Sequence, residues 1–168
     1  MRRLVPLALC AACGAAQQPS GGGRVRVEVR RPPSVVDSAR FEAHVTARRC
    51  GSGRGLVLEG IDGGNGVLVW IRFAPAESLT AGPYAMLVRG DTVARRGAVA
   101  TVRWMQGEAA HGMLLDSGTV TVSSPPVAGR MSASAAGSGI EYIGARRASV
   151  TAVFSDVRVA AETTGCGR

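Results

Sequence analysis

Apolar and polar residues alternate with a period of two over much of the chain. Between Arg24 and Arg30, valines occupy every second position and charged side chains lie between them. Ala39–Ala47 repeats the pattern, with Phe41 and Val45 on the apolar side. This alternation is typical of a half-buried antiparallel strand that turns one face to a core and the other to water. The two stretches therefore predict a pair of β-strands.

The other predicted strands are short segments bounded by glycine, proline or polar turns. They are Leu56–Ile61, Val67–Phe73, Tyr84–Arg89, Ala98–Met105, Gly118–Ser123, Val127–Ala135 and Ser149–Val159, with Met113–Leu115 as a further candidate. Val67–Phe73 is apolar on both faces, so we expect it to be central and its Trp70 to lie in the core. Ser124–Pro126 is expected to connect Gly118–Ser123 and Val127–Ala135 as the turn of a loose hairpin. About nine strands without a convincing helix predict an all-β fold, an antiparallel β-sandwich or barrel.

The first thirteen residues, MRRLVPLALCAAC, follow a different pattern. Two arginines precede an apolar run of about nine residues, which ends in small residues before Cys13. This layout is typical of a secretory signal, and the run is far shorter than the ~20 residues of a membrane-spanning helix. We expect a signal peptide over 1–12, a lipidated N-terminus and flexible spacer over 13–23, and a single β domain over 24–168. Simple secretion with cleavage after Ala16 is the alternative.

The leader resembles those of bacterial lipoproteins, in which the cysteine after the small residues is lipidated and becomes the mature N-terminus. A second resemblance extends from Leu79 to Val159. There LTAGPY, SGTVTVSS, VAGRMSASA and SVTAVFSDVRV are similar to segments of small β-rich bacterial lipoproteins of unknown function. The resemblance implies a β fold and a protein anchored in the bacterial cell envelope by palmitate or a similar chain on Cys13. It implies no activity. Gly14 after the cysteine favours the outer membrane, if the host has one, whereas a soluble secreted or periplasmic protein is the alternative.

Two cysteines, Cys50 and Cys166, remain beyond the leader region. In an exported domain they permit one internal disulfide, and two unpaired thiols are the alternative. Metal binding is disfavoured because no CxxC or closely spaced histidines supply further ligands. We therefore predict a disulfide and no metal site.

The sequence offers no convincing catalytic set. His44 and His111 are the only histidines, and Ser138 in Gly-Ser-Gly lacks the surroundings of a hydrolase nucleophile. The carboxylates are dispersed, so no pair resembles a glycosidase site. Asp62–Gly66 lacks the alternating carboxylates of a calcium loop, and Gly51–Gly55 is not followed by a helix that could bind phosphate. We therefore predict a non-enzymatic protein without a cofactor.

All 20 basic residues are arginines, and the formal net charge is +8, or +6 once Arg2 and Arg3 leave with the leader. The arginines are scattered in pairs and are not interleaved with aromatic residues, so no specific nucleic-acid binding is expected. Trp104 beside Arg103 is the candidate for an exposed contact with a partner.

These observations predict an exported, membrane-tethered protein with a non-enzymatic binding or structural role in the envelope. Its expected partners are the membrane, through the N-terminal lipid, and an unknown envelope protein or glycan. A β-barrel that carries a small apolar ligand is the alternative. An envelope hydrolase is less favoured, since it needs His44 or His111 beside a serine and an aspartate.

Overall fold

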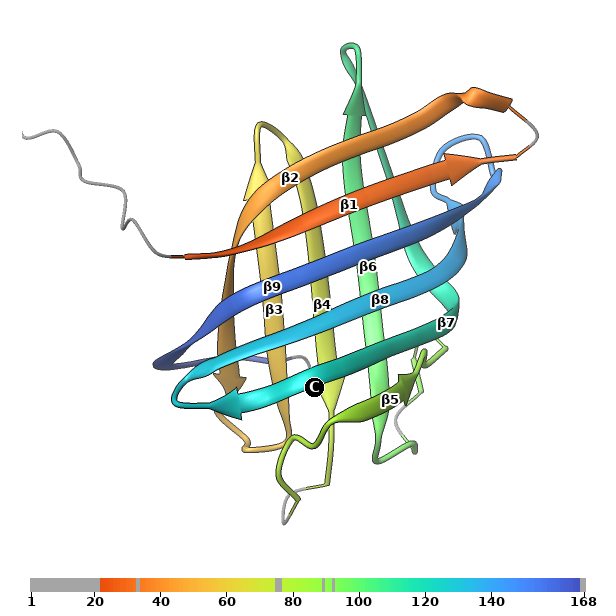
Figure 1. The fold of residues 1–168 in the computed structure, drawn as a ribbon. Coiled ribbons are helices and arrows are strands. Elements are labelled where there is room, and N and C mark those ends of the chain that lie inside the picture. Colours follow the sequence, from red (N-terminus) through yellow and green to blue (C-terminus); the bar gives the residue numbers. More distant parts are fainter. Residues whose placement is uncertain (1–21, 33, 75–76, 89, 92, 167–168) are drawn as a thin grey trace, which may run out of the picture.

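The structure is a computed structural model that describes residues 22–32, 34–74, 77–88, 90–91 and 93–166 (Figure 1). The predicted signal peptide, the lipidation site Cys13 and nearly all of the spacer lie outside these residues. The described regular structure is β-strand. Within this part of the chain, no helix has the length and apolar character needed to cross a membrane.

Nine strands make up the fold. They are β1 (Gly23–Arg31), β2 (Ser34–Cys50), β3 (Gly55–Asp62), β4 (Asn65–Arg72), β5 (Gly82–Ala85), β6 (Gly97–Gln106), β7 (Ala109–Val127), β8 (Arg130–Glu141) and β9 (Arg147–Thr164). Eight of them close into a barrel in the order β1-β2-β3-β4-β6-β7-β8-β9, and β9 pairs back to β1. The short β5 pairs with β7 outside this ring. The predicted all-β fold is confirmed, and of the two architectures it is the barrel that forms.

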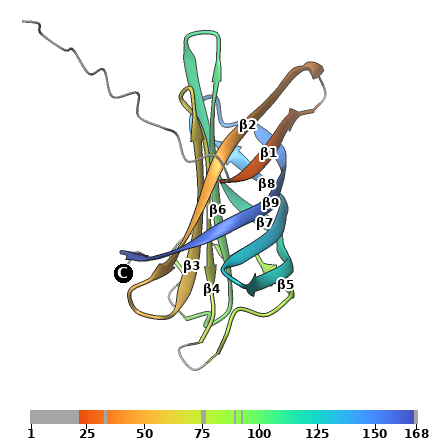
Figure 2. The same ribbon diagram turned by 60° about the vertical axis from the view of Figure 1, so that its left-hand side comes forward.

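The barrel has two layers whose strands run in different directions (Figures 1 and 2). β3, β4 and β6 form one layer, and β1, β9, β8 and β5 lie in the other. The two long strands belong to both layers. β2 pairs with β1 up to Val45 and with β3 from Val45 onward. β7 pairs with β6 up to Leu114, with β8 from Met113 onward and with β5 from Thr119 to Val122. Strands that change layer in this way form the corners of orthogonally packed sheets.

Glycines permit the close approach of β7 and β8 at one corner. A Cβ atom on Gly118 would lie 2.2 Å from the carbonyl oxygen of Ala136, and Gly118 has a φ of +120°. A Cβ atom on Gly139 would lie 2.1 Å from the carbonyl oxygen of Leu114. The register between the strands shifts next to Gly118, which marks a β-bulge. Bulges and glycines are the usual means by which a strand bends sharply in a sheet.

Some strand boundaries differ from the prediction. Met113–Leu115 and Gly118–Ser123 belong to a single strand, β7, because the bulge bends this strand without ending it. Pro125 and Pro126 also lie in β7, where the register with β8 is shifted and the missing N–H groups break no regular ladder. The turn comes later, at Ala128 and Gly129.

Two other predicted strands end elsewhere. β5 ends at Ala85, short of the predicted Arg89, and β8 extends to Glu141, beyond the predicted Ala135.

Inward-facing side chains from around the barrel form one hydrophobic cluster. The valines of β1 at positions 25, 27 and 29 are fully buried, and the charged residues between them face outward, as the alternation predicted. Phe41 on β2 and Phe154 on β9 belong to the same cluster. The core residues are at most 9% exposed, so the interior is filled by side chains.

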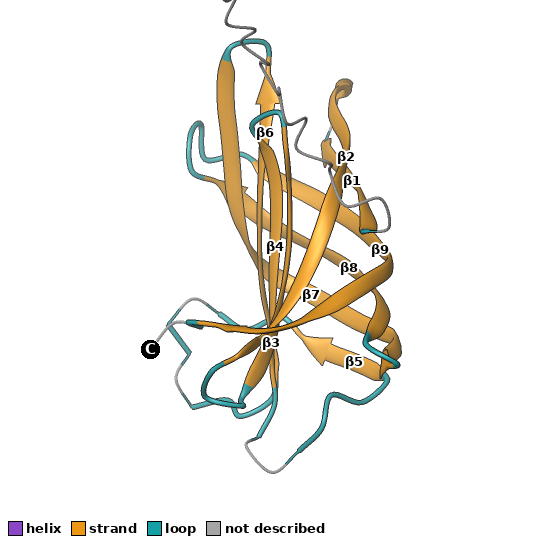
Figure 3. Cartoon of the chain, turned by 90° about the vertical axis from the view of Figure 1, so that its left-hand side faces the viewer, coloured by secondary structure: helices purple, strands orange, loops and turns teal. Residues whose placement is uncertain are grey.

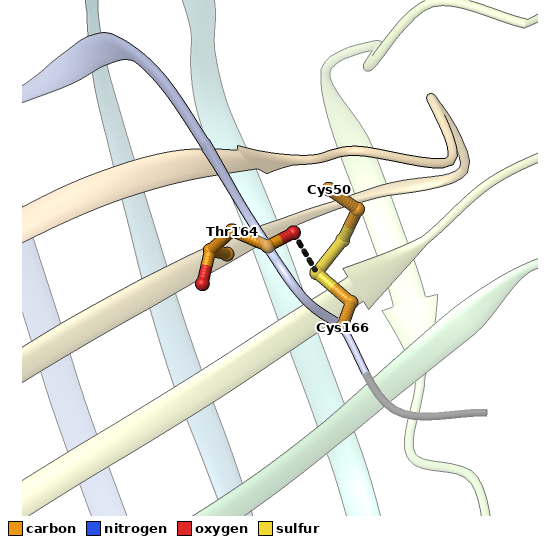
Figure 4. The surroundings of a disulfide bond; sticks show 3 residues. All are labelled: Cys50, Thr164 and Cys166. Atoms are coloured by element: carbon orange, nitrogen blue, oxygen red, sulfur yellow. Dashed lines mark hydrogen bonds between the residues drawn. A yellow bond between two sulfur atoms is a disulfide. The ribbon is translucent and has the colours of Figure 1, made fainter.

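The predicted disulfide joins Cys50 and Cys166, whose Cα atoms are 5.4 Å apart (Figure 4). The last residues of β9 pair in parallel with the last residues of β2, and this pairing brings the end of β9 to Cys50. The N–H of Gly51 donates to the carbonyl oxygen of Thr164 at 3.0 Å, and the Cys166 sulfur lies 3.9 Å from the same oxygen. The disulfide therefore fastens the end of β9 to the end of β2.

Candidate functional site at one end of the barrel

Two charged residues, Arg31 and Glu141, are buried among the described residues. Arg31 is the last residue of β1 and Glu141 the last residue of β8. Both continue the inward-facing pattern of their strands, since every second residue before them is buried or half-buried. The period of two that builds the apolar core therefore also places these two charges inside the barrel, at its end.

Arg31 contacts three side chains. Its Nε lies 2.8 Å from Oε1 of Glu141 in an ion pair that lacks hydrogen-bond alignment. Its Nη1 donates to Oε1 of Gln106 at 2.7 Å. The guanidinium carbon lies 5.1 Å from the centre of the Trp104 ring, within the range of a cation–π contact. Arg31 thus connects β1 to β8 and, across the barrel, to β6.

His111 completes this group of side chains. Its Nδ1 lies 3.3 Å from Oε2 of Glu141, and its ring stacks on Trp104 with the centroids 5.5 Å apart. Strand register explains both contacts. Trp104 on β6 is directly opposite His111 on β7, and Glu141 is opposite Met113, two residues further along β7. We call Arg31, Trp104, Gln106, His111 and Glu141 the polar cluster.

Removing two charges from water opposes folding unless both find partners. Glu141 has Arg31 on one carboxylate oxygen and His111 near the other, whereas Arg31 has Glu141, Gln106 and the Trp104 ring. The two buried charges are therefore largely compensated by partners within the cluster. The cluster closes one end of the apolar interior with side chains from β1, β6, β7 and β8.

Three buried N–H groups of the cluster have no hydrogen-bond partner among the described residues. Nε of Arg31 still lies beside the Glu141 carboxylate, which leaves Nη2 of Arg31 and Nε1 of Trp104. Buried donors are usually paired, and each of these can donate to a water molecule or to an oxygen atom of a bound molecule. Both atoms are shielded from solvent, so such an oxygen atom reaches them only when neighbouring side chains move.

Large apolar side chains are exposed next to the cluster. Ile140, Tyr142 and Ile143 flank Glu141 and are 47%, 64% and 68% exposed. The backbone that carries them is held in place, because the Tyr142 N–H donates to the carbonyl of Gly112 and the Glu141 N–H to that of Arg146, each at 2.9 Å. We call these three residues the β8–β9 rim. Exposed apolar residues grouped in this way are typical of an interaction surface.

The predicted contact residues are not both at the surface. Arg103 is exposed, but Trp104 is only 1% exposed, so the prediction for Trp104 is wrong. Trp104 shares its side of β6 with Ala100 and Val102, which face the core. The prediction that Trp70 lies in the core is also wrong. This residue is only half-buried, on the side of β4 away from the core, with the Arg72 guanidinium 5.3 Å from its ring.

The residues weighed for catalysis lie in separate places. His44 is exposed on β2, whereas His111 bonds to Glu141 in the polar cluster. Ser138 instead meets Ser117, with their Oγ atoms 2.9 Å apart, and accepts a hydrogen bond from Arg147. Within the described ranges no three His, Cys, Asp or Glu residues form a group that could hold a metal ion.

Comparison with known proteins gives no relative. No protein-family model, no curated protein and no solved structure matches the chain.

Proposed function

We propose that the protein is an exported, membrane-tethered lipoprotein whose barrel has a non-enzymatic binding role in the bacterial cell envelope. The Cys50–Cys166 disulfide is the observation that carries this proposal. Structural disulfides persist in oxidising compartments and are rare in reducing ones. A protein that builds one between two distant strands is suited to life outside the cytoplasm.

The start of the barrel is consistent with a tether. β1 begins at Gly23, so the residues after Cys13 form a short connection between the proposed lipid and the first strand. A chain extends by at most about 3.6 Å per residue, which keeps the barrel within roughly 35 Å of the anchor. A domain held at this distance can act only on molecules of the envelope or its immediate surroundings.

The β8–β9 rim is the surface we assign to partner binding. It offers Ile140, Tyr142 and Ile143 to solvent on a backbone held by hydrogen bonds. The adjacent cluster supplies two buried N–H donors, which an oxygen atom of the partner can reach when neighbouring side chains move. Such a surface suits an envelope protein or a glycan, both of which combine apolar faces with oxygen acceptors.

The tether is tested by labelling with a radioactive fatty acid. The wild-type chain should carry the label and fractionate with membranes, and Cys13→Ser should lose both properties. Cys10→Ser is the matched control and should keep them. If Cys13→Ser remains membrane-bound with unchanged mass, the lipoprotein assignment is wrong.

The binding surface is tested by crosslinking in intact cells. A variant with Tyr142→Ser and Ile143→Ser should lose the crosslinked envelope partner or glycan and keep its melting temperature. Ile61→Ser near the end of β3 is the control, since Ile61 is similarly exposed (65%) but belongs to a different hairpin. Unchanged crosslinking in the rim variant would move the binding surface elsewhere.

The second candidate, a carrier of a small apolar ligand, is favoured by the closed eight-stranded barrel, a size that can hold one small ligand. The near-complete burial of the interior side chains speaks against it, because residues around a ligand-sized cavity would be partly accessible. Organic extraction of the natively purified protein, followed by mass spectrometry, decides between the two. A stoichiometric apolar compound would establish the carrier.

A further inference from the structure

One stretch of β2 has a strand on only one side. β2 pairs with β3 from Val45 to Arg49, but from Ala39 to His44 the only pairing it makes within the described chain is with β1. Figures 1 and 3 show this part of β2 at the margin of its layer, diverging from β3 and β4. The backbone N–H and C=O groups along the outer side of Ala39–His44 can therefore pair with another strand.

The outward face of this edge carries charges of both signs. Arg40 and Glu42 point outward from β2, and each is directly opposite a residue of unlike charge on β1. Arg40 bonds to Glu28 at 2.8 Å, and Glu42 accepts a hydrogen bond from Arg26 at 2.8 Å. Charged side chains and proline often protect sheet edges from pairing. Here the edge carries a positive charge followed by a negative one, so two copies of this stretch that run antiparallel can place unlike charges opposite each other.

We propose that two copies of the chain dimerise by antiparallel pairing of their β2 edges, with the two-fold axis at Phe41. In this register Arg40 lies opposite Glu42 of the partner subunit, and Glu42 lies opposite Arg40 of the partner subunit. Cross-strand pairs of unlike charge stabilise a sheet, whereas like charges directly opposite each other destabilise it. Two favourable pairs form at once because the two-fold axis relates them.

The β1 strands extend the same arrangement. Reading across the four strands, Arg26 and Glu42 of one chain continue into Arg40 and Glu28 of the partner subunit, so the signs alternate plus, minus, plus, minus. The symmetry-related row alternates minus, plus, minus, plus. Each charge therefore has unlike neighbours on both sides.

The neighbouring registers lack this complementarity. A two-fold axis at Arg40 places the two Arg40 side chains opposite each other, and an axis at Glu42 does the same for the two carboxylates. Among the registers centred on these three residues, only the axis at Phe41 pairs unlike charges. An unrelated peptide would need its own matching sequence, but a second copy supplies it automatically, and this selects the second copy as the occupant.

The outward face beside this edge is also open to solvent. Arg26, Glu28, Arg40 and Glu42 are among the residues of β1 and β2 that line an open depression of about 540 Å³ on it.

The test measures the dimerisation of the full chain carrying Cys13→Ser, by sedimentation over a wide range of protein concentrations. The parent chain should form a dimer. Arg40→Glu places like charges opposite each other twice across the two-fold axis, and Glu42→Arg does the same, so each should raise the dissociation constant about tenfold or more. The combined variant Arg40→Glu/Glu42→Arg restores unlike pairs across the interface and should dimerise again.

The double variant separates the interface from the fold, because it restores unlike pairs between the chains but places like charges in both pairs with β1. Arg147→Glu, an equal charge change on β9, is the matched control and should dimerise like the parent chain. Circular dichroism and thermal melting monitor the fold of each variant. A monomeric parent chain at every concentration overturns the proposal, as does a dimer that neither single charge reversal weakens.

Discussion

Arg31 Nε and Glu141 Oε1 lie 2.8 Å apart inside one end of the barrel, and the two side chains are only 5% and 3% exposed. The residues are 110 positions apart in the sequence and come from strands that are separated by β9. A buried pair of this kind adds little net stability compared with apolar residues, but the loss of one partner leaves an uncompensated charge. This asymmetry leads to a direct test.

Replacement of Glu141 by glutamine should lower the free energy of unfolding by about 3–5 kcal/mol, because the Arg31 charge remains buried without its counterion. Urea denaturation measures this change. The double variant Arg31→Met/Glu141→Leu should recover much of the loss, since it removes both charges together. Arg26→Met, which breaks the exposed pair with Glu42, should cost less than about 1 kcal/mol. Equal effects of Glu141→Gln and Arg26→Met would contradict a buried pair.

The stability of the barrel should depend on Glu28 in acid. Hydrogen bonds from Arg30 and Arg40 lower the pKa of Glu28 from 4.5 to about 2. Because this pKa is lower in the folded chain, the ionised side chain contributes stability above about pH 4.5 that is lost as the pH falls toward about 2. Melting temperatures of wild type and Glu28→Gln should therefore differ most above pH 4.5 and converge near pH 2. An NMR titration that places the Glu28 pKa at its ordinary value would refute the prediction.

Loss of the disulfide should lower the melting temperature without abolishing the fold. The bond spans 116 residues, and the chain-entropy estimate for a loop of this order is roughly 4–5 kcal/mol, an amount that strain or residual unfolded structure reduces. We expect Cys50→Ala/Cys166→Ala to melt several degrees below the parent chain. The reduced parent chain should have the same melting temperature as the double variant. Thiol labelling of Cys50 or Cys166 in the non-reduced protein would exclude the bond.

Gly118→Ala should destabilise the barrel strongly, because its Cβ would lie 2.2 Å from the carbonyl oxygen of Ala136 and the φ of +120° disfavours any side chain. Gly129→Ala is the control. Gly129 also has a positive φ, +75°, but no atom lies within 4 Å of its Cβ position, so only the backbone preference of about 1 kcal/mol is lost. Denaturation midpoints should therefore fall much further for Gly118→Ala. Similar midpoints would mean that β7 and β8 can shift at this corner to make room for the Cβ atom, which would contradict the prediction.

The sequence predicts the strands well where alternation is strict, as in β1, because each outward charge and inward valine marks a face. It predicts strand ends less well. Pro125 and Pro126 are predicted to lie in a hairpin turn, yet they belong to β7 because a register shift removes the need for their N–H groups. Such a shift depends on the partner strand, and local sequence does not contain that information.

The polar cluster could be predicted only in part. Arg31 has the same parity as Val25, Val27 and Val29, and Trp104 the same parity as Val102, so the sequence contains a signal that both face inward. Their partners Glu141 and Gln106 are fixed by barrel closure and by contacts across the interior. These contacts follow from the three-dimensional arrangement and have no counterpart in local spacing.

β1 has a mechanical consequence for a tethered protein. It begins at Gly23, where the chain from the proposed anchor enters the barrel, and ends at Arg31, a member of the polar cluster. A pull between the membrane and a partner held at the β8–β9 rim therefore runs lengthwise along β1. This strand is paired on both sides, with β2 and with β9, so the force loads two rows of hydrogen bonds in shear and does not peel them apart one at a time.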